Sequence, residues 1–229
     1  MKIKVRGGLF ETNSSSAHVF VVGKHSGLLT EEDVREEAYI RDGELLLYLT
    51  DVEDGFGRWP FRLLATFADK VAYALCEYCG CLQYGSKEFN ENYQMVLNVV
   101  REILPEIDGF QLKSEKVRPY LDKDGNQLEP WKVCYRNDGT GNYKEMYEVE
   151  GEWYEAKEAD YYIDEPQIGC IDHQSAGMLK NFLARHEITL REFLLNKKYM
   201  IFVDGDECHE FDKLVRYHII NLNDFEEVE

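Results

Sequence analysis

The stretch of this sequence with the most closely spaced reactive and hydrogen-bonding side chains is residues 11–18, which ends in a histidine. Serine hydroxyls, an asparagine amide and nearby backbone N–H groups can surround a phosphate, and an arginine can add a charge-assisted hydrogen bond. A histidine can transfer protons or bind a metal. The residues of this candidate site are Arg6, Glu11, Thr12, Asn13, Ser14, Ser15, Ser16 and His18.

A purely structural interpretation of the same run is also open. Neighbouring side chains point in different directions, so they can face one ligand only if the loop is compact and irregular. Serine and asparagine side chains also bond their own backbone in tight turns. The sequence is compatible with both interpretations.

The stretch from Arg6 to His18 resembles the opening of a group of uncharacterised proteins encoded by bacteriophages and mobile elements of Firmicutes. Those proteins are similar in an Arg-x-Gly-x-Phe-Glu-Thr-Asn-Ser-Ser-Ser-x-His pattern, with weaker similarity at 171–175 and 203–207. The residues that flank the histidine are often hydroxylic in that group, whereas here they are Ala17 and Val19. The resemblance implies a phage or prophage context and no particular reaction.

A second polar cluster lies at an expected strand-to-helix turn, where helix N-termini attract anions. It consists of Asp172, His173, Gln174 and Ser175. Asp172 has a plain alternative role as an N-cap. If His173 and His18 meet in one pocket, the two imidazoles could run acid–base chemistry, with Glu11 or Asp172 orienting one of them. Gln174 and Ser175 would then bind the ligand.

Three cysteines, Cys76, Cys79 and Cys81, occupy the expected end of a helix. Their spacing resembles half of a zinc site, but a full site needs a second ligand pair. The remaining candidates are scattered along the chain: Cys134, Cys170, Cys208 and His209. We therefore expect buried or incidental thiols and assign no metal, and the acidic 204–207 stretch is expected to be a turn. The sequence contains no Walker loop, GxGxxG, GxSxG or HExxH motif.

The 229 residues carry a formal net charge of −18, which disfavours direct binding to nucleic acid or to an anionic membrane. Nine acidic residues but only two lysines lie between positions 142 and 165. They form either a solvated face or a surface for a basic partner. No apolar run is long enough to span a membrane, so we expect a cytoplasmic protein, and the resemblance implies a bacterial host cell.

Hydrophobic periodicity predicts one α+β domain over residues 1–229, with a central helical hairpin at about 59–104 and an acidic antiparallel meander at about 109–164. Strands from the two ends of the chain are expected to pair. The first hairpin helix should start at Pro60 and end at Gly80, and the second should be capped by Ser86. The other expected elements are strands at 2–6, 17–22, 44–50, 199–203 and 215–220, helices at 31–38, 172–185 and from Thr189, and a loose tail from 224.

Two functions remain open at this point. In the first, the Ser-rich loop binds, and in one version processes, a phosphate-bearing small molecule such as a nucleotide. In the second, the protein is a non-catalytic acidic interaction protein, a nucleic-acid mimic or anti-defence inhibitor that acts on a basic host protein. The sequence does not decide between an enzyme and a binding protein.

Overall fold

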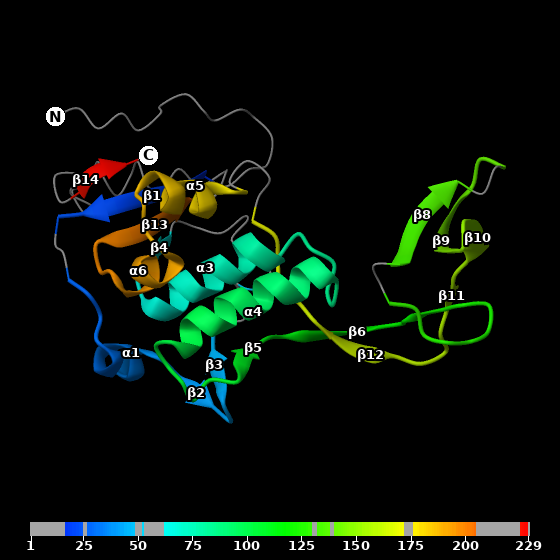
Figure 1. Cartoon of the computed structure of the whole chain (residues 1–229), viewed down its shortest axis with the longest axis horizontal. Helices are drawn as coiled ribbons and strands as arrows, with labels where there is room; N and C mark the ends of the chain where they lie inside the picture. Colours follow the sequence, from blue (N-terminus) through cyan, green and yellow to red (C-terminus); the bar gives the residue numbers. More distant parts are fainter. Residues whose placement is uncertain are drawn as a thin grey trace. The chain divides into compact units, whose positions relative to one another are not determined.

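Strands from the two ends of the chain lie side by side in a four-stranded antiparallel sheet of order β14-β1-β13-β4 (Figure 1). The computed structural model describes residues 17–24, 27–48, 52, 62–129, 132–137, 140–171, 176–204 and 225–228. The strands of this sheet are β1 (Ala17–Gly23), β4 (Arg62–Leu64), β13 (Tyr199–Asp204) and β14 (Phe225–Val228). The predicted α+β class and the pairing of terminal strands are confirmed.

The prediction of a loose tail from residue 224 is wrong, because Phe225–Val228 forms strand β14. It pairs with β1 in the register Val21↔Val228 and thereby supplies hydrogen-bond partners to that edge. This strand depends on a partner about 200 positions away, so local sequence gave no sign that Phe225–Val228 is a strand. The strands expected at 2–6 and 215–220 lie outside the described residues.

Five helices are described: α1 (Glu31–Glu37), α3 (Phe67–Cys79), α4 (Lys87–Arg101), α5 (Met178–Arg185) and α6 (Leu190–Leu195). Thr30 and Thr189 begin α1 and α6 with capping boxes, and the Ser86 hydroxyl accepts the Phe89 amide at the start of α4. The predicted Ser86 cap and the predicted helix starts at Glu31 and near Thr189 are confirmed. No helix of the described residues is long and apolar enough to cross a membrane.

The first hairpin helix starts later than predicted. Residues 62–64 pair with β13 as strand β4, and the helix begins only after Thr66, whose hydroxyl accepts the Asp69 amide at 3.2 Å in a capping box. The predicted start at Pro60 is therefore wrong, because a non-local strand pairing and a stronger cap override the apolar spacing. In Figure 1, α3 lies beside residues 94–101 of α4.

The chain forms two compact units. Unit 1 comprises residues 1–81, 94–112 and 168–229, and unit 2 comprises residues 82–93 and 113–167. The single domain over 1–229 stays a prediction.

The core of unit 1 is built where one face of the main sheet meets three helices. The Phe20 ring on β1 contacts Tyr73 of α3, Phe182 of α5 and Phe193 of α6, with ring centroids 4.8–5.9 Å apart. Phe20 is 3% exposed. Since aromatic side chains bury large areas, this position holds the helices against the sheet.

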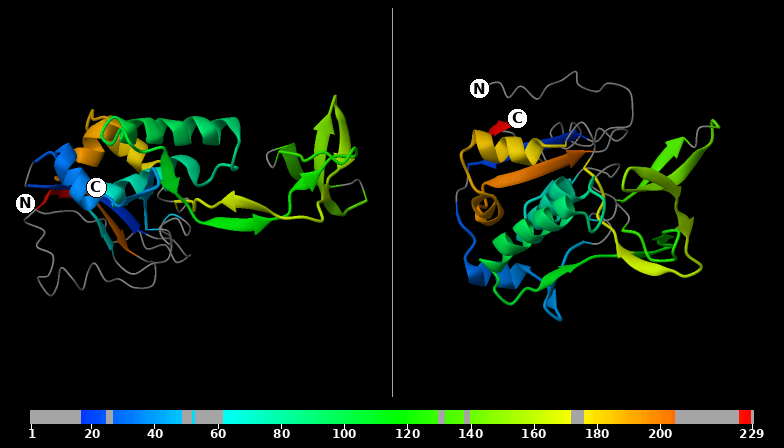
Figure 2. Two further views of the ribbon diagram at one scale, coloured as in Figure 1. Left: turned by 90° about the horizontal axis from the view of Figure 1, so that it is seen from below. Right: turned by 45° about the vertical axis from the view of Figure 1, so that its right-hand side comes forward.

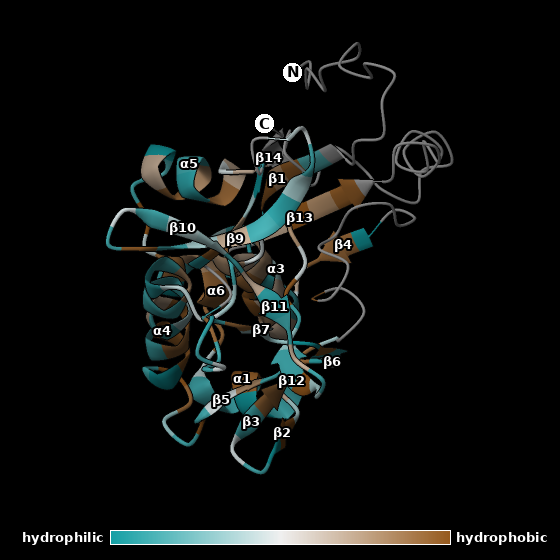
Figure 3. Cartoon of the chain, turned by 90° about the vertical axis from the view of Figure 1, so that its right-hand side faces the viewer, coloured by the Kyte–Doolittle hydropathy of each residue, from teal (hydrophilic) through white to brown (hydrophobic). Residues whose placement is uncertain are grey.

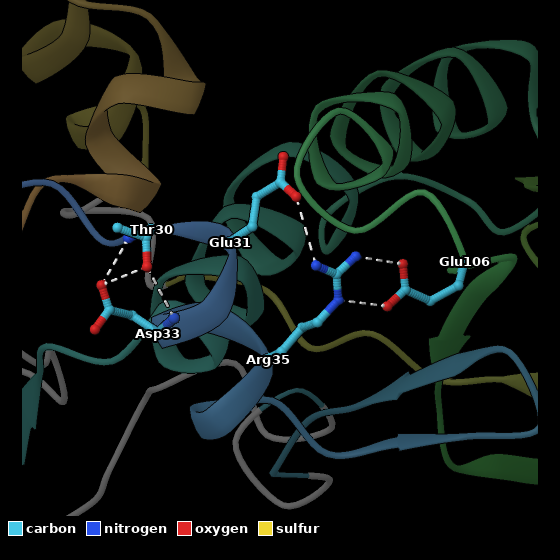
Figure 4. A network of polar contacts seen from close by, with 5 residues as sticks. All are labelled: Thr30, Glu31, Asp33, Arg35 and Glu106. Carbon is cyan, nitrogen blue, oxygen red and sulfur yellow. Dashed lines mark hydrogen bonds and ion pairs between the residues drawn. The ribbon is translucent and has the colours of Figure 1, made fainter.

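A small sheet of order β2-β3-β5 completes unit 1, with strands β2 (Ile40–Arg41), β3 (Glu44–Leu46) and β5 (Gly109–Gln111). Arg35 of α1 forms a two-pronged ion pair with Glu106, at 3.1 and 3.2 Å, and reaches Glu31 at 3.4 Å (Figure 4). The pairing lowers the pKa of Glu106. It ties α1 to the segment that follows α4.

Unit 2 contains a three-stranded antiparallel meander, as predicted, together with two further antiparallel strand pairs (Figure 2). Its strands are β6 (Ser114–Val117), β7 (Tyr120–Leu121), β8 (Val133–Asn137), β9 (Tyr143–Val149), β10 (Glu152–Glu155), β11 (Lys157–Glu158) and β12 (Ile163–Pro166). They form a sheet β10-β9-β8 and the pairs β11-β7 and β12-β6. A small core of Leu128, Tyr147 and Ala156 supports them.

Lys70 of α3 is fully buried. Its Nζ donates to the carbonyl oxygens of Phe193 and Asn196, at 3.3 and 2.8 Å, which belong to the last turn and C-cap of α6. A cation is favourable at a helix C-terminus. Burial nevertheless lowers the pKa of Lys70 to about 8, against the opposing influence of Glu37 and Asp69.

The low pKa of Lys70 predicts a pH-dependent stability. The unfolded amine titrates near 10.5 and the folded amine near 8, so the unfolded chain binds more protons between these values. The free energy of unfolding should therefore rise through this window as pH increases. Two acceptors suffice for the two N–H groups of a neutral amine. We expect wild type to gain up to about 3 kcal/mol relative to Lys70→Met between these pH values in urea unfolding.

The control is Lys87→Met, because the Lys87 side chain is 88% exposed. Its difference from wild type should stay flat over the same pH range. If the difference in the free energy of unfolding from wild type varied with pH in the same way for Lys70→Met and Lys87→Met, the low pKa would not belong to Lys70.

Candidate functional site

Among the residues predicted to form the phosphate or catalytic site, the structure describes only His18. The others lie outside the described residues: Arg6, Glu11, Thr12, Asn13, Ser14, Ser15, Ser16, Asp172, His173, Gln174 and Ser175. The convergence of His18 and His173, and the grip of the Ser-rich loop on a phosphate, therefore stay predictions.

His18 is a buried residue near the start of β1, opposite Val203 of β13. Its side chain is 4% exposed and its Nδ1 lies 2.9 Å from the hydroxyl oxygen of Tyr73, with which it hydrogen-bonds. The two rings are 5.5 Å apart. Because His18 faces the same side of the sheet as Phe20, its imidazole is part of the layer between β1 and α3. The catalytic role of His18 stays a prediction. The structure shows that its imidazole is buried and hydrogen-bonded to Tyr73.

One turn after Tyr73, Glu77 projects from the same face of α3. Both carboxylate oxygens are buried, and no donor of the described residues reaches them with good hydrogen-bond geometry. Burial raises the pKa of Glu77, while the backbone amides of Gly177 and Lys180 and the charge of Lys180 oppose the shift. These amides belong to the start of α5.

Glu77 supplies the negative charge that the start of α5 lacks. The N-cap of this helix is Gly177, which has no side chain and a positive φ of 85°. The prediction that Asp172 caps the helix is therefore wrong, since the helix begins six residues later at Met178. A carboxylate near a helix N-terminus is favourable, and here it comes from α3. No local sequence signal could have linked Glu77 to Gly177.

The structure gathers four thiols at the C-terminal end of α3. The sequence predicts three of them there and misses Cys170, which comes from a distant part of the chain. Cys76 and Cys79 are buried, whereas Cys81 and Cys170 are exposed, and none of the four is in a disulfide. Burial raises the pKa of Cys76 well above its usual value and that of Cys79 to about 12, and the charges of the other thiols add to the shift at Cys76. No group of three or more His, Cys, Asp or Glu in the described part of the chain is arranged to hold a metal ion.

The hairpin of β9 and β10 presents carboxylates around its tip. Its turn is Glu150-Gly151, both with positive φ, as tight hairpins require. Glu148 and Glu152 flank this turn, and all three glutamates are exposed. Four further exposed acids follow in unit 2: Glu155, Glu158, Asp160 and Asp164. Glu155 pairs with Lys144 at 2.7 Å and Glu158 with Arg118 at 3.7 Å.

Two tyrosines stack on the surface of the same sheet. Tyr135 of β8 and Tyr143 of β9 have ring centroids 5.8 Å apart and nearly parallel planes, and they are 68% and 60% exposed. The alternation of β9 places Tyr143 on the same face as Tyr147, which is buried in the small core. This face therefore runs from a packed interior to an exposed aromatic surface.

A comparison of the chain with protein-family models finds no match, and comparisons with curated proteins and with solved structures find no significant match.

The buried hydrogen bond of His18 can be tested by Tyr73→Phe, which removes the hydroxyl and keeps the ring. Loss of a partner to a buried polar atom should lower the free energy of unfolding by about 1–3 kcal/mol in urea denaturation. Tyr84→Phe is the matched control, because Tyr84 is more exposed and packs edge-to-face on Phe89. It should change stability by less than about 0.5 kcal/mol, and equal effects of the two changes would argue against a structural role for the hydrogen bond.

Proposed function

We propose that this protein is an interaction protein that binds a partner with a basic surface through unit 2. The observation that carries the proposal is that one small sheet displays an acidic hairpin tip at one end of β9 and a pair of stacked, exposed tyrosines at its other end. We call Tyr135, Tyr143, Glu148, Glu150 and Glu152 together the acidic–tyrosine surface. It extends along β9, and Glu148 alternates to the face opposite the tyrosines.

Acidic residues alone are explained by solubility, so the tyrosines are needed for the argument. Large exposed aromatic side chains are enriched at protein interfaces, where they provide contact area at a low cost in conformational entropy. Among the described residues of unit 2, the exposed large hydrophobic side chains are Tyr84, Tyr135, Tyr143, Val149, Tyr161 and Tyr162. Figure 3 shows the contrast between the hydrophilic strand β11 and the hydrophobic strand β13 of unit 1.

The acidic–tyrosine surface stands on ordered strands. Tyr147 packs against Tyr154, and its hydroxyl accepts the Lys123 amide at 2.7 Å. Both strand pairings of β9 are regular, from Val133↔Tyr147 to Asn137↔Tyr143 and from Glu152↔Val149 to Glu155↔Met146. A surface held in place before binding loses less entropy when a partner docks.

The chemistry of the surface favours arginine in the partner. A guanidinium can stack on an aromatic ring and also pair with a carboxylate. Unit 2 uses the same geometry internally: Arg136 lies 4.0 Å from the ring centroid of Trp153, and Arg118 lies 5.0 Å from that of Tyr162.

The charge of unit 2 supports attraction of such a partner. Residues 82–93 and 113–167 contain sixteen Asp and Glu but only nine Lys and Arg. A negative potential raises the association rate of cationic partners and repels nucleic acid. A nucleic-acid mimic, in which carboxylates occupy a basic site meant for phosphates, is one form of this function. The competing hypothesis of a phosphate-bearing ligand at the Ser-rich loop stays a prediction.

Charge reversal at the hairpin tip tests the location of the binding surface. We expect Glu148→Lys, Glu150→Lys and Glu152→Lys together to weaken binding of a short oligo-arginine peptide by at least about tenfold at low ionic strength. The loss should shrink as salt screens the charges. Fluorescence anisotropy with a labelled peptide gives the dissociation constants of wild type and of the triple variant.

The control changes the net charge of the chain equally but in unit 1. It carries Glu32→Lys, Glu36→Lys and Glu44→Lys, at three exposed positions. We expect it to weaken binding by less than about threefold, through the general potential alone. Similar losses in the two triple variants would mean that oligo-arginine binds wherever the chain is acidic, and the proposal would fail.

The tyrosine pair predicts a preference for arginine over lysine. Tyr135→Ala with Tyr143→Ala should weaken oligo-arginine binding about fivefold and oligo-lysine binding less, because guanidinium stacks better than ammonium on an aromatic face. Tyr39→Ala is the control, since Tyr39 is 77% exposed but belongs to unit 1. Equal losses for the two peptides would remove the tyrosines from the interface.

A further inference from the structure

Two exposed thiols from distant parts of the chain meet at the end of α3. The Cys170 thiol donates a hydrogen bond to the carbonyl oxygen of Gly80 at 2.8 Å. Gly80 directly precedes Cys81, and standard peptide dimensions put its carbonyl oxygen about 2.8 Å from the Cys81 Cα. The Cys170 sulfur therefore lies within about 5.6 Å of the Cys81 Cα. Burial, and after it the nearby Cys81 thiol, raises the pKa of Cys170.

The backbone brings the two cysteines this close. A Cβ at Gly80 would overlap the carbonyl group of Gly169, so glycine is required where the two segments touch. The Gly169 amide in turn donates to the Val52 carbonyl, which fixes its segment within unit 1. Each glycine precedes one of the two cysteines, so the contact between Gly80 and Gly169 brings the two cysteines close together. A disulfide requires about 4.4–6.8 Å between the two Cα atoms.

We propose that Cys81 and Cys170 are a redox-active dithiol that forms a reversible intramolecular disulfide with a low-molecular-weight disulfide such as oxidised glutathione. In the first step the Cys81 thiolate attacks one glutathione sulfur, forms a mixed disulfide and releases one glutathione thiolate. In the second step the Cys170 thiolate attacks the Cys81 sulfur and displaces the other. The protein loses two electrons and two protons, and oxidised glutathione becomes two reduced molecules.

Exposure assigns these roles. Cys76 and Cys79 are buried and shielded from a reagent in solution, whereas Cys81 and Cys170 are both exposed. Partial burial raises the pKa of Cys170 to about 12, and the neighbouring Cys81 thiol adds to the shift. Both exposed thiols in turn add to the raised pKa of the buried Cys76. Since little Cys170 is thiolate at neutral pH, Cys81 attacks first and the closing step should accelerate with pH.

The position of the pair in the chain gives the bond a consequence. Cys81 is the last residue of the first segment of unit 1, and Cys170 is near the start of its last segment. The loop between them contains α4, β5 and the whole of unit 2. Closing so long a loop restricts the unfolded chain strongly, so the disulfide should raise the melting temperature. This inference does not depend on the proposed function.

To test this, the 229-residue protein is treated with oxidised glutathione, and the remaining thiols are then blocked. Disulfides are mapped by peptide mass spectrometry under non-reducing conditions. We expect a Cys81–Cys170 link within one molecule, reversed by dithiothreitol. Cys134→Ser, which changes an exposed thiol of unit 2, should form the link as wild type does. Cys170→Ser should stop at a glutathione adduct on Cys81. Separate adducts on both cysteines of wild type, or a link that omits either one, would overturn the proposal.

Two further readouts test the mechanism in wild type. The closing rate should rise about tenfold per pH unit between about pH 7 and 9, because the Cys170 thiolate fraction does so. The melting temperature of the oxidised protein should exceed that of the reduced protein by several degrees, with no rise in Cys170→Ser. A closing rate that does not change with pH, or an unchanged melting temperature, would overturn the assigned mechanism.

Discussion

The burial of α3 is the constraint on which the rest of unit 1 depends. A helix packed on several sides must place every polar side chain against a matching group, because an unmatched one costs free energy. Lys70 reaches the C-terminus of α6, and Glu77 faces the N-terminus of α5. The cation thus meets the negative end of one helix and the carboxylate the positive end of another. These two contacts fix which helix termini can lie against α3.

The same helix also sets the environment of His18 and of the thiols. Tyr73 lies one turn before Glu77 and binds the His18 imidazole. Gly80 ends the helix where the backbone at Gly169 needs the space that a Cβ would fill. A shift of α3 along its axis would break these contacts together with those of Lys70. Such mutual dependence is typical of a cooperative core and explains why Phe20, which contacts three helices through one ring, is so deeply buried.

What the sequence predicts well in this protein is local. Thr30, Ser86 and Thr189 each cap a helix through atoms three residues away, so their residue types suffice. What it misses is non-local: the pairing of residues 62–64 with β13 and the approach of Cys170 to Cys81 join positions far apart in the chain. Of the predicted site, only the placement of His18 is described, because the Ser-rich loop and 172–175 lie outside the described residues.

Unit 2 separates the residues that hold its fold from those that face solvent. Register is fixed by the positive-φ turn at Glu150-Gly151 and by Asp122, whose carboxylate accepts the amides of Asp124 and Asn126. Tyr147 packs one face of the sheet against the small core of Leu128 and Ala156. Because strand residues alternate between faces, and the tip acids lie outside the small core, exposed positions can change with little effect on packing. The chemistry of the surface is therefore free to match a partner, while the strands that display it stay the same.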